Sequence, residues 1–142
     1  MISFLICAFN EEDNIEDTYS TIIESLQLAK INSYQIVIIN DGSLDLTEEK
    51  IKKIVNNDNK VIFETNSKNL GYGNSFIKGL KLIENDRFMI VPGDNDLSKN
   101  TILSGLKNLE KADMIMMFPI NTDNRNKTRN IVSILFRLIY LI

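Results

Sequence analysis

The stretch Phe88-Met89-Ile90-Val91-Pro92-Gly93-Asp94-Asn95-Asp96 passes from an apolar run directly into two carboxylates separated by one residue. The apolar run is typical of a buried strand, so the acids are expected where that strand ends. Such an oxygen-rich corner suits Mg²⁺ or Mn²⁺ carrying a diphosphate. A plain turn is the alternative interpretation, since Gly, Asp and Asn are among the commonest turn residues.

The composition limits the classes of function that the chain can have. Its 142 residues are a one-domain length, and 16 basic against 19 acidic residues give a net charge of −3. No global basic field therefore attracts nucleic acid, and an acidic protein that handles phosphates needs a metal ion to offset charge repulsion. The absence of histidine excludes Ser-His-Asp and Cys-His catalysis and any His-ligated zinc site.

The single cysteine, Cys7, lies in the apolar run Ile2–Ala8 and is interpreted as a small core residue. One cysteine cannot form an internal disulfide, which favours a reducing cytoplasm. No cleavable signal peptide is evident, because no basic segment precedes the apolar run. The expected location is therefore cytoplasmic.

Short β-like runs alternate with helical patterns along the chain, as is typical of an α/β sheet with crossover helices. The runs are mostly apolar, which favours a parallel sheet covered on both faces. The predicted fold is an open, mostly parallel Rossmann-like sheet flanked by helices. The expected strands are Ile2–Cys7, Ile36–Ile39, Val61–Phe63, Phe88–Val91 and Met114–Phe118.

Apolar residues recur at helical spacing between these strands. Asp45 and Glu48 predict a capping box, and Ser98 predicts an N-cap. Gly79 allows its helix to approach the sheet closely. The expected buried stripes are Ile15, Tyr19, Ile22, Leu26 and Ala29, then Ile51, Ile54 and Val55, then Phe76, Ile77, Leu80 and Ile83, and finally Ile102, Leu106 and Leu109.

The end of the chain differs in composition from the rest. Residues 121–130 are polar and carry Arg125, Lys127 and Arg129, which indicates a long loop of a kind that is often functional. Residues 131–142 form an amphipathic helical pattern that is too short for a membrane span, which needs roughly 20 residues. The pattern favours a core helix whose covering partner is absent, and self-association or a place at a membrane surface are alternatives.

Polar segments follow three of the predicted strands, at the carboxyl ends where open parallel sheets bind ligands. These segments carry Glu11, Asp41 and the Asp94–Asp96 pair, which are expected to converge on one crevice. Like charges that converge make sense if they share a cation or accept hydrogen bonds from a ligand. Asp41 is able to accept from a base N–H or a ribose hydroxyl, and Phe9 offers a flat apolar surface for a base, although the Asp41 segment also suits a turn that opens a helix.

Four motifs together resemble the family 2 glycosyltransferases, which have the type A nucleotide-sugar-binding fold. The nearest-looking branch is the dolichol-phosphate mannose synthase-like group. The resemblance covers roughly residues 2–97. The four motifs taken together are far more specific for this family than any one of them alone. The motifs are Phe9-Asn10-Glu11-Glu12, Asn40-Asp41-Gly42-Ser43-Leu44-Asp45-Leu46-Thr47, Asn69-Leu70-Gly71-Tyr72-Gly73-Asn74 and Asp94-Asn95-Asp96.

The resemblance implies roles for the matched positions. Phe9 and Glu11 would contact the nucleoside, and Asp41 would hold the base. Asp94 and Asp96 would serve as the catalytic pair, placing the ribose and an Mg²⁺ or Mn²⁺ ion on the donor diphosphate. The metal would then act as a Lewis acid on the departing nucleoside diphosphate.

Several positions depart from the family pattern or allow two interpretations. Cys7 stands where the family usually has proline, Phe9 replaces tyrosine, and Asn40 replaces the first of two aspartates, which puts base specificity in doubt more than the fold. Gly71 and Gly73 favour a tight strand-to-helix turn over phosphate contact.

The resemblance implies a nucleotide-sugar-binding domain over residues 1–120 and the start of an incomplete acceptor region over residues 121–142. The basic residues of the second segment, Arg125, Lys127 and Arg129, suit an anionic polyprenyl phosphate acceptor, or else a solvated loop. A chain that uses such an acceptor is expected at the inner face of the membrane, as a peripheral protein.

The leading hypothesis is an inverting glycosyltransferase that moves a sugar from a nucleoside-diphosphate sugar to an acceptor, with a polyprenyl phosphate as one candidate. The second hypothesis is a donor-binding fragment without turnover. A sugar-nucleotide pyrophosphorylase is disfavoured because the loop after the first strand, Phe9–Asp13, is acidic and lacks glycine. A response-regulator-like sheet is disfavoured because no lysine lies at the matching late strand end.

Overall fold

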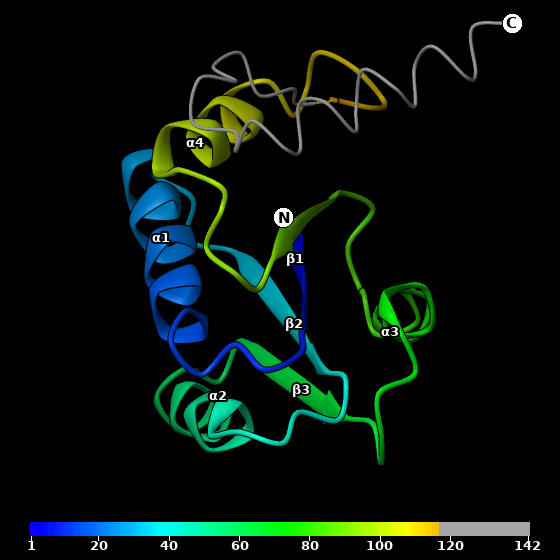
Figure 1. Cartoon of the computed structure of the whole chain (residues 1–142). Helices are drawn as coiled ribbons and strands as arrows, with labels where there is room; N and C mark the ends of the chain where they lie inside the picture. The colour runs from blue at the N-terminus through cyan, green and yellow to red at the C-terminus, as the bar shows by residue number, and fades with distance from the viewer. Residues whose placement is uncertain (117–142) are drawn as a thin grey trace, which may run out of the picture.

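The structure is a computed structural model that describes residues 1–116 as a four-stranded parallel sheet with helices on both faces (Figure 1). Strands and helices alternate along the chain, as the sequence predicts. The sheet has the strand order β3-β2-β1-β4, so the first strand lies inside the sheet. The elements are β1 (Ile2–Ala8), α1 (Ile15–Leu28), β2 (Tyr34–Asn40), α2 (Thr47–Asn57), β3 (Val61–Thr65), α3 (Tyr72–Leu80), β4 (Phe88–Pro92) and α4 (Lys99–Lys107).

The register of the sheet brings the ends of the strands level with one another. Leu5 in β1 pairs with Val37 in β2 on one side and with Ile90 in β4 on the other. At the carboxyl end, Ala8 pairs with Asn40, which in turn pairs with Thr65 of β3. The segments that follow these strands therefore begin at the same edge of the sheet.

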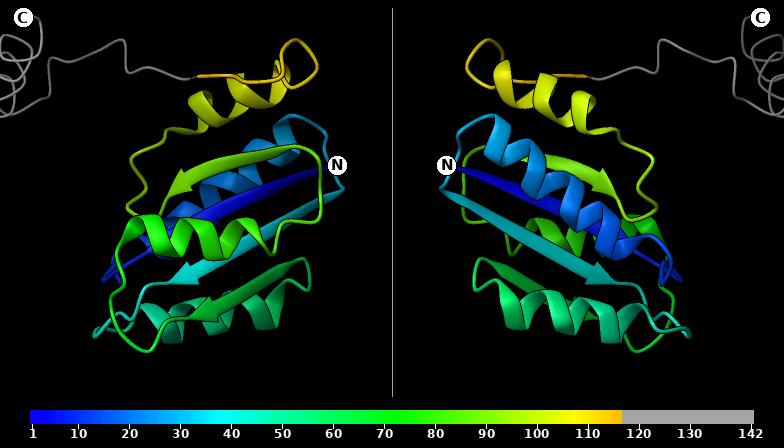
Figure 2. Two further views of the ribbon diagram at one scale, coloured as in Figure 1. Left: turned by 90° about the vertical axis from the view of Figure 1, so that its right-hand side faces the viewer. Right: turned by 90° about the vertical axis from the view of Figure 1, so that its left-hand side faces the viewer.

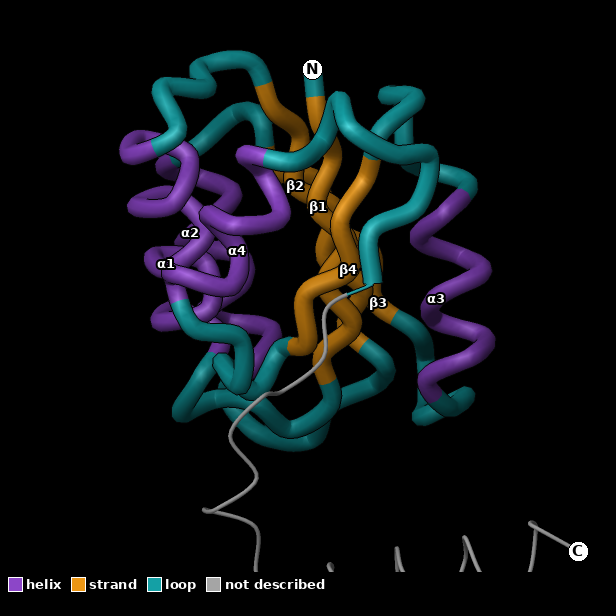
Figure 3. Tube along the Cα trace, turned by 90° about the horizontal axis from the view of Figure 1, so that it is seen from above, coloured by secondary structure: helices purple, strands orange, loops and turns teal. Residues whose placement is uncertain are grey.

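The sheet separates two apolar layers, which Figure 3 shows from above with α1, α2 and α4 on one face and α3 on the other. Alternate residues of a strand point to opposite faces. Phe4 and Ile6 of β1 accordingly pack in the larger core under α1, α2 and α4, whereas Leu5 packs with Val37 and Ile39 in the smaller core under α3. Burial on both faces explains why these strands are continuously apolar.

Several local predictions are confirmed. Ile15, Ile22 and Leu26 of α1 are buried in the larger core, and the Ser98 side chain accepts a hydrogen bond from the Thr101 N–H at the start of α4. A Cβ at Gly79 would lie 2.2 Å from a side-chain carbon of Leu5, so glycine lets α3 approach the sheet closely. No helix among residues 1–116 has the length and apolar character needed to cross a membrane.

Two local predictions about the helices are wrong in detail. Ile77 does not belong to the buried stripe of α3, because its side chain is 56% exposed. Asp45 and Glu48 do not form a capping box: α2 begins after Leu46, and the Glu48 carboxylate lies 2.6 Å from the ammonium of Lys52. The sequence has the residue spacing of a capping box, but the Glu48 carboxylate pairs with the Lys52 ammonium and not with the backbone at the start of α2.

The expected strand Met114–Phe118 is not present over its described part. Met114, Ile115 and Met116 belong to no strand, and Met114 is 77% exposed. An apolar run predicts a strand only if a neighbour supplies the backbone hydrogen bonds, and here the Arg87 side chain instead holds the chain through the Ala112 carbonyl. The rest of that run, the boundary at residue 120, Arg125, Lys127, Arg129 and the pattern over 131–142 lie outside the described residues.

Candidate functional site

The polar segments singled out in the sequence all leave the carboxyl edge of the sheet. Figure 2 shows the four strands pointing in the same direction, so the segments after β1, β2 and β4 start from one side of the molecule. The Asp41 N–H donates to the Ala8 carbonyl at 2.8 Å, and the Asn66 N–H donates to the Asn40 carbonyl at 2.9 Å. The end of β1 is thereby joined to the end of β2, and the end of β2 to the end of β3.

The segments after β1 and β2 exchange hydrogen bonds in pairs. The Asn10 N–H donates to the Ser43 hydroxyl at 2.9 Å, and the Leu44 N–H donates back to the Asn10 side-chain oxygen at 2.9 Å. Asn10 adopts a left-handed φ of 56°, a conformation that asparagine tolerates better than most residues. The two loops consequently form one unit rather than two independent turns.

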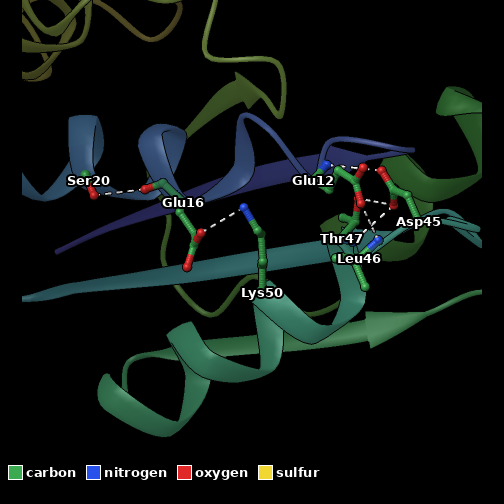
Figure 4. Close-up of polar contacts among 7 residues, drawn as sticks. All are labelled: Glu12, Glu16, Ser20, Asp45, Leu46, Thr47 and Lys50. Atoms are coloured by element: carbon green, nitrogen blue, oxygen red, sulfur yellow. Dashed lines mark hydrogen bonds and ion pairs between the residues drawn. The ribbon is translucent and has the colours of Figure 1, made fainter.

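A second reciprocal pair lies further along the same two loops (Figure 4). The Glu12 N–H donates to the Asp45 carboxylate at 3.1 Å, and the Leu46 N–H donates to the Glu12 carboxylate at 2.8 Å. Asp45 also accepts from the Thr47 N–H at 3.0 Å. Both acids are therefore engaged in joining the loops.

Phe9 and Glu11 lie on this joined pair of loops. Phe9 is 40% exposed, which leaves part of its ring available to a ligand. The Glu11 N–H donates to the Thr47 hydroxyl at 2.8 Å, and its carboxylate accepts from the Asn14 side chain at 2.9 Å. The backbone at Glu11 is thus fixed, and one carboxylate oxygen has no hydrogen bond to the described residues.

Asp41 is buried, with only 4% of its surface exposed. Its Oδ1 accepts from the Asn66 side chain at 2.8 Å and from the Leu70 N–H at 3.0 Å, and its Oδ2 accepts from the Gly71 N–H at 2.9 Å. Burial by itself would raise the pKa of Asp41, but these hydrogen bonds outweigh it and hold the pKa below the ordinary value. Asp41 is therefore an ionised acceptor that fastens the loop before α3.

Gly42 and Gly71 show why this loop needs glycine. Gly42 has a φ of +71°, and a Cβ there would lie 2.4 Å from the backbone carbonyl carbon of Lys68. Gly71 has a φ of +85° and is the N-cap residue of α3. A positive φ favours glycine at both positions. At Gly71 this supports the interpretation of the residue as part of a tight turn into α3.

The Asp94 and Asp96 carboxylates are exposed on the loop that follows β4. Asp94 Oδ1 accepts from the Asp96 N–H at 3.2 Å. Between them, Asn95 has a left-handed φ of 54° and its side-chain oxygen accepts from the Thr21 hydroxyl at 3.2 Å. The middle residue is thus bonded to α1, while the acids on either side are left accessible.

The acids of the three loops do not gather into a preformed metal cluster. Within residues 1–116, no three acidic or thiol side chains lie close enough together to hold one ion. Of the two reasons given for converging acids, a cation shared by three of them has no preformed cluster in this part of the chain. Asp41 is buried against its own loop, so Asp94 and Asp96 remain as the hard, exposed oxygen pair.

Two side chains that the sequence analysis overlooked support this edge. The buried Thr18 hydroxyl donates to the Gly93 carbonyl at 2.9 Å, which attaches the loop of Asp94 to α1. The buried Asn66 side chain contacts Asp41 from the end of β3. Thr18 was detectable as a polar residue within the apolar stripe of α1, whereas no spacing in the sequence pairs Asn66 with Asp41.

Cys7 lies at the end of β1 on the α3 face of the sheet, where it packs with the smaller core. Burial, and secondly the charge of Asp41, raises the pKa of the Cys7 thiol to about 11. The interpretation of this cysteine as a core residue is thus supported. A thiol with so high a pKa is a poor nucleophile at neutral pH.

A cavity of about 630 Å³ lies elsewhere, along β4 and the start of the chain that follows α4. Its lining includes Phe88, Ile90, Leu109 and Met114, and none of the loop residues at the carboxyl edge. The lining is largely apolar, and its two acids, Asp86 and Asp113, come from different segments of the chain. This cavity is therefore separate from the candidate site.

Curated relatives of the chain are glycosyltransferases. The chain is 33% identical over 127 residues to a poly-beta-1,6-N-acetyl-D-glucosamine synthase of Staphylococcus aureus. The matched segment covers 89% of this chain and 30% of the synthase. It is 31% identical over 115 residues to an uncharacterized glycosyltransferase of Haemophilus influenzae, which covers 81% of the chain and 34% of that protein. The chain thus spans about a third of the length of these relatives.

Solved structures share the fold. The crystal structure of S. aureus TarS 1–349 in complex with UDP-GlcNAc has a TM-score of 0.64 at 20% identity, and the match covers 89% of this chain and 37% of TarS 1–349. The mannosyltransferase PcManGT from Pyrobaculum calidifontis, in complex with GDP-Man and Mn²⁺, has a TM-score of 0.63 at 15% identity and covers 75% of this chain and 31% of PcManGT. These likenesses confirm the nucleotide-sugar-binding type of α/β fold.

The family match extends over almost the whole sequence. The pattern described as "Glycosyl transferase family 2" matches residues 3–140. Together, the comparisons support the family and not specifically the dolichol-phosphate mannose synthase-like group. The chain belongs to glycosyl transferase family 2.

Proposed function

We propose that the chain binds a nucleoside-diphosphate sugar at the carboxyl edge of its sheet and transfers the sugar with inversion. The observation that carries the proposal is the contrast among the acids there. Glu12, Asp41 and Asp45 accept hydrogen bonds from backbone N–H groups of neighbouring loops. Asp94 and Asp96, one residue apart, form an exposed pair of acids just after the end of β4.

The exposed pair fits a divalent cation of the Mg²⁺ or Mn²⁺ type. Asp94 Oδ1 accepts the Asp96 N–H, which leaves the other Asp94 oxygen and both Asp96 oxygens without hydrogen bonds among residues 1–116. Hard carboxylate oxygens suit such ions, which typically keep several ligand positions for water and substrate phosphates. A bound ion would supply positive charge against the departing diphosphate.

The surrounding residues would place the rest of the donor. The exposed part of the Phe9 ring and the free carboxylate oxygen of Glu11 face a nucleoside from the joined loops. Asp41, whose Oδ2 already accepts the Gly71 N–H, would accept a base N–H through its small exposed part. The base, the ribose and the diphosphate would then lie along a line from β2 to β4.

The acceptor we propose is an anionic phosphate on a polyprenyl carrier, bound with the help of Arg125 and Arg129 at the cytoplasmic face of a membrane. Arginine is the residue type whose planar guanidinium binds phosphate through two parallel N–H bonds. In the transfer, the bond from the anomeric carbon to the donor diphosphate breaks and a bond to an acceptor oxygen forms. An ionised phosphate oxygen needs no base to remove a proton, which suits a chain without histidine.

A second proposal is that these 142 residues bind the donor without transferring the sugar. It is favoured by the length comparison, because the chain spans 30% of the S. aureus synthase to which it is similar. An assay of sugar transfer, run beside a nucleotide-binding assay, separates the two proposals. Transfer supports the first, and donor binding without transfer supports the second.

The experiment that tests donor binding is Asp96→Asn, measured by titration with UDP-GlcNAc and GDP-mannose in the presence of Mn²⁺. We expect metal-dependent binding to be lost, because an amide has no charge and only one acceptor oxygen. Asp17→Asn, at an exposed acid on α1, is the matched control and should bind as the wild type does. Undiminished binding by Asp96→Asn would contradict the assignment of Asp96.

A further inference from the structure

We infer that Asn66 is a positioning residue that aims the Asp41 carboxylate and thereby sets which base the donor site accepts. This inference rests on the proposed function, in which Asp41 meets the base. Asn66 follows the last residue of β3 and is 5% exposed, so a direct contact with the ligand is not expected. It acts only through its contacts with Asp41 and with α3.

The orientation of the Asn66 amide is fixed by the chemistry of its neighbours. The Lys78 ammonium lies 2.9 Å from one end of the amide and is only able to donate, so that end is the oxygen. The NH₂ group therefore faces Asp41 Oδ1 at 2.8 Å and the Ser75 hydroxyl at 2.9 Å. Turning the amide over would place an oxygen against a carboxylate and an NH₂ group against an ammonium.

The backbone of Asn66 is held as firmly as its side chain. Its N–H donates at 2.9 Å to the carbonyl of Asn40, which is the residue just before Asp41. The Ser75 hydroxyl that it contacts is fully buried in α3. Asn66 thus connects the ends of β2 and β3 with α3, and it lies at the centre of that connection.

The consequence for Asp41 is directional. Oδ1 receives the Asn66 amide and the Leu70 N–H, which uses both of its lone pairs. Oδ2 receives the Gly71 N–H, and the Ser75 hydroxyl is a further hydrogen-bond donor to this carboxylate. The carboxylate is therefore held in one orientation with only 4% of the residue exposed, and we expect a base to be selected by whether it offers an N–H in that direction.

The test compares UDP and GDP binding, with Mn²⁺, by the full 142-residue chain and two variants. Asn66→Asp replaces the donating amide with a carboxyl group beside Asp41, and Lys78→Met removes the cation that orients the amide. We expect each variant to change the ratio of the UDP and GDP dissociation constants, by about tenfold for Asn66→Asp, the size typical of losing a charge-assisted hydrogen bond. Glu64→Gln is the matched control, because it removes the 2.9 Å ion pair with Lys78 and leaves the contact between Lys78 and Asn66.

Asn66→Asp adds a readout that a purely structural role would not produce. Two carboxyl groups so close share a proton at low pH, and the shared proton restores the donor that the amide supplied. The charged and titratable groups around them are Lys78 on α3, Glu64 on β3 and Cys7 on β1. Relative to the wild type at each pH, nucleotide binding by this variant should be near normal at pH 5 and weakened at pH 8.

The outcomes separate this inference from the function on which it rests. A wild-type chain that binds neither nucleotide contradicts the proposed function, and the inference falls with it. Wild-type binding with an unchanged UDP to GDP ratio in Lys78→Met overturns the inference alone, and so does a pH-independent Asn66→Asp. Lys78→Met alters a partly exposed side chain, so it remains informative if Asn66→Asp does not fold.

Discussion

The hydroxyl of Thr18 in α1 donates a hydrogen bond of 2.9 Å to the carbonyl of Gly93, the residue before Asp94. Thr18 is 1% exposed, and a Cβ at Gly93 would lie 3.2 Å from both the Ala8 Cβ and the Cys7 carbonyl oxygen. The first residue of the acidic loop is therefore held between α1 and the end of β1. The loop that carries the accessible Asp94 and Asp96 is therefore anchored at its first residue.

Thr18→Val should weaken metal-dependent donor binding and lower the free energy of unfolding. Valine keeps the shape of threonine but leaves the buried Gly93 carbonyl without this donor, which costs about 1–3 kcal/mol. Urea denaturation and nucleotide titration with Mn²⁺ measure the two effects. Ser25→Ala, which removes another buried hydroxyl of α1 that donates to the Thr21 carbonyl, is the control and should leave nucleotide affinity unchanged. Equal affinity in wild type and Thr18→Val would show that the anchor does not matter for binding.

Gly42→Ala should destabilise the fold more than a glycine substitution elsewhere on the same edge. Alanine at position 42 combines a φ of +71° with a Cβ placed 2.4 Å from backbone of Lys68, and we expect a loss of more than about 1 kcal/mol. Gly73→Ala is the matched control, because its Cβ meets nothing within 4 Å and lies in α3. There, alanine should stabilise by roughly 0.5–1 kcal/mol. Urea denaturation that ranked the two variants the other way would contradict the packing of the Lys68 loop on Gly42.

Cys7 should react slowly with iodoacetamide at pH 8. Its pKa of about 11 leaves a thiolate fraction on the order of one in a thousand at that pH, and the thiolate is the reactive form. Mass spectrometry of the alkylated protein between pH 7 and 10 measures the rate, and protein unfolded in urea supplies the unperturbed reference. Asp41→Asn should speed the reaction, since the negative charge of Asp41 contributes to the raised pKa. A native rate equal to that of the unfolded chain would place Cys7 outside the core.

Asp41 should contribute stability that disappears in acid. The folded-state pKa of Asp41 lies below its unfolded value, which is about 3.9, so its contribution is complete above that pH and is lost as the pH falls through the folded pKa. The difference in unfolding free energy between wild type and Asp41→Asn should be constant from pH 7 to 5. It should shrink towards pH 3 and below. A difference that grew on acidification would mean that the folded state prefers the protonated acid.

The sequence predicts the sheet well because burial leaves a direct mark on it. Continuously apolar runs make the strands around Leu5, Val37 and Ile90 visible without any structure, although Ile90 is 38% exposed whereas Leu5 and Val37 are fully buried. Met114–Met116 carries the same mark without a partner strand, and hydrophobicity alone does not distinguish the two cases.

The location of the site is also predictable, whereas the engagement of its acids is not. Strand ends place Glu12, Asp41 and Asp94 at one edge, yet only tertiary contacts decide that Glu12 and Asp41 accept backbone N–H groups while Asp94 stays exposed. The partners of Asp41 are 25 to 30 residues away in the chain. No local sequence pattern encodes such a pairing, so motifs alone do not identify Asn66 as a partner of Asp41.

The most direct test of the central claim is calorimetric titration of the 142-residue chain with UDP-GlcNAc and with GDP-mannose, each with Mn²⁺ and with EDTA. If Asp94 and Asp96 carry a divalent ion on the donor diphosphate, at least one nucleotide sugar will bind with Mn²⁺ and binding will be lost in EDTA. At 100 times the dissociation constant, that ligand should add about 2.7 kcal/mol to the free energy of unfolding. Binding of equal strength with and without the metal, or no binding of either donor, would contradict the account.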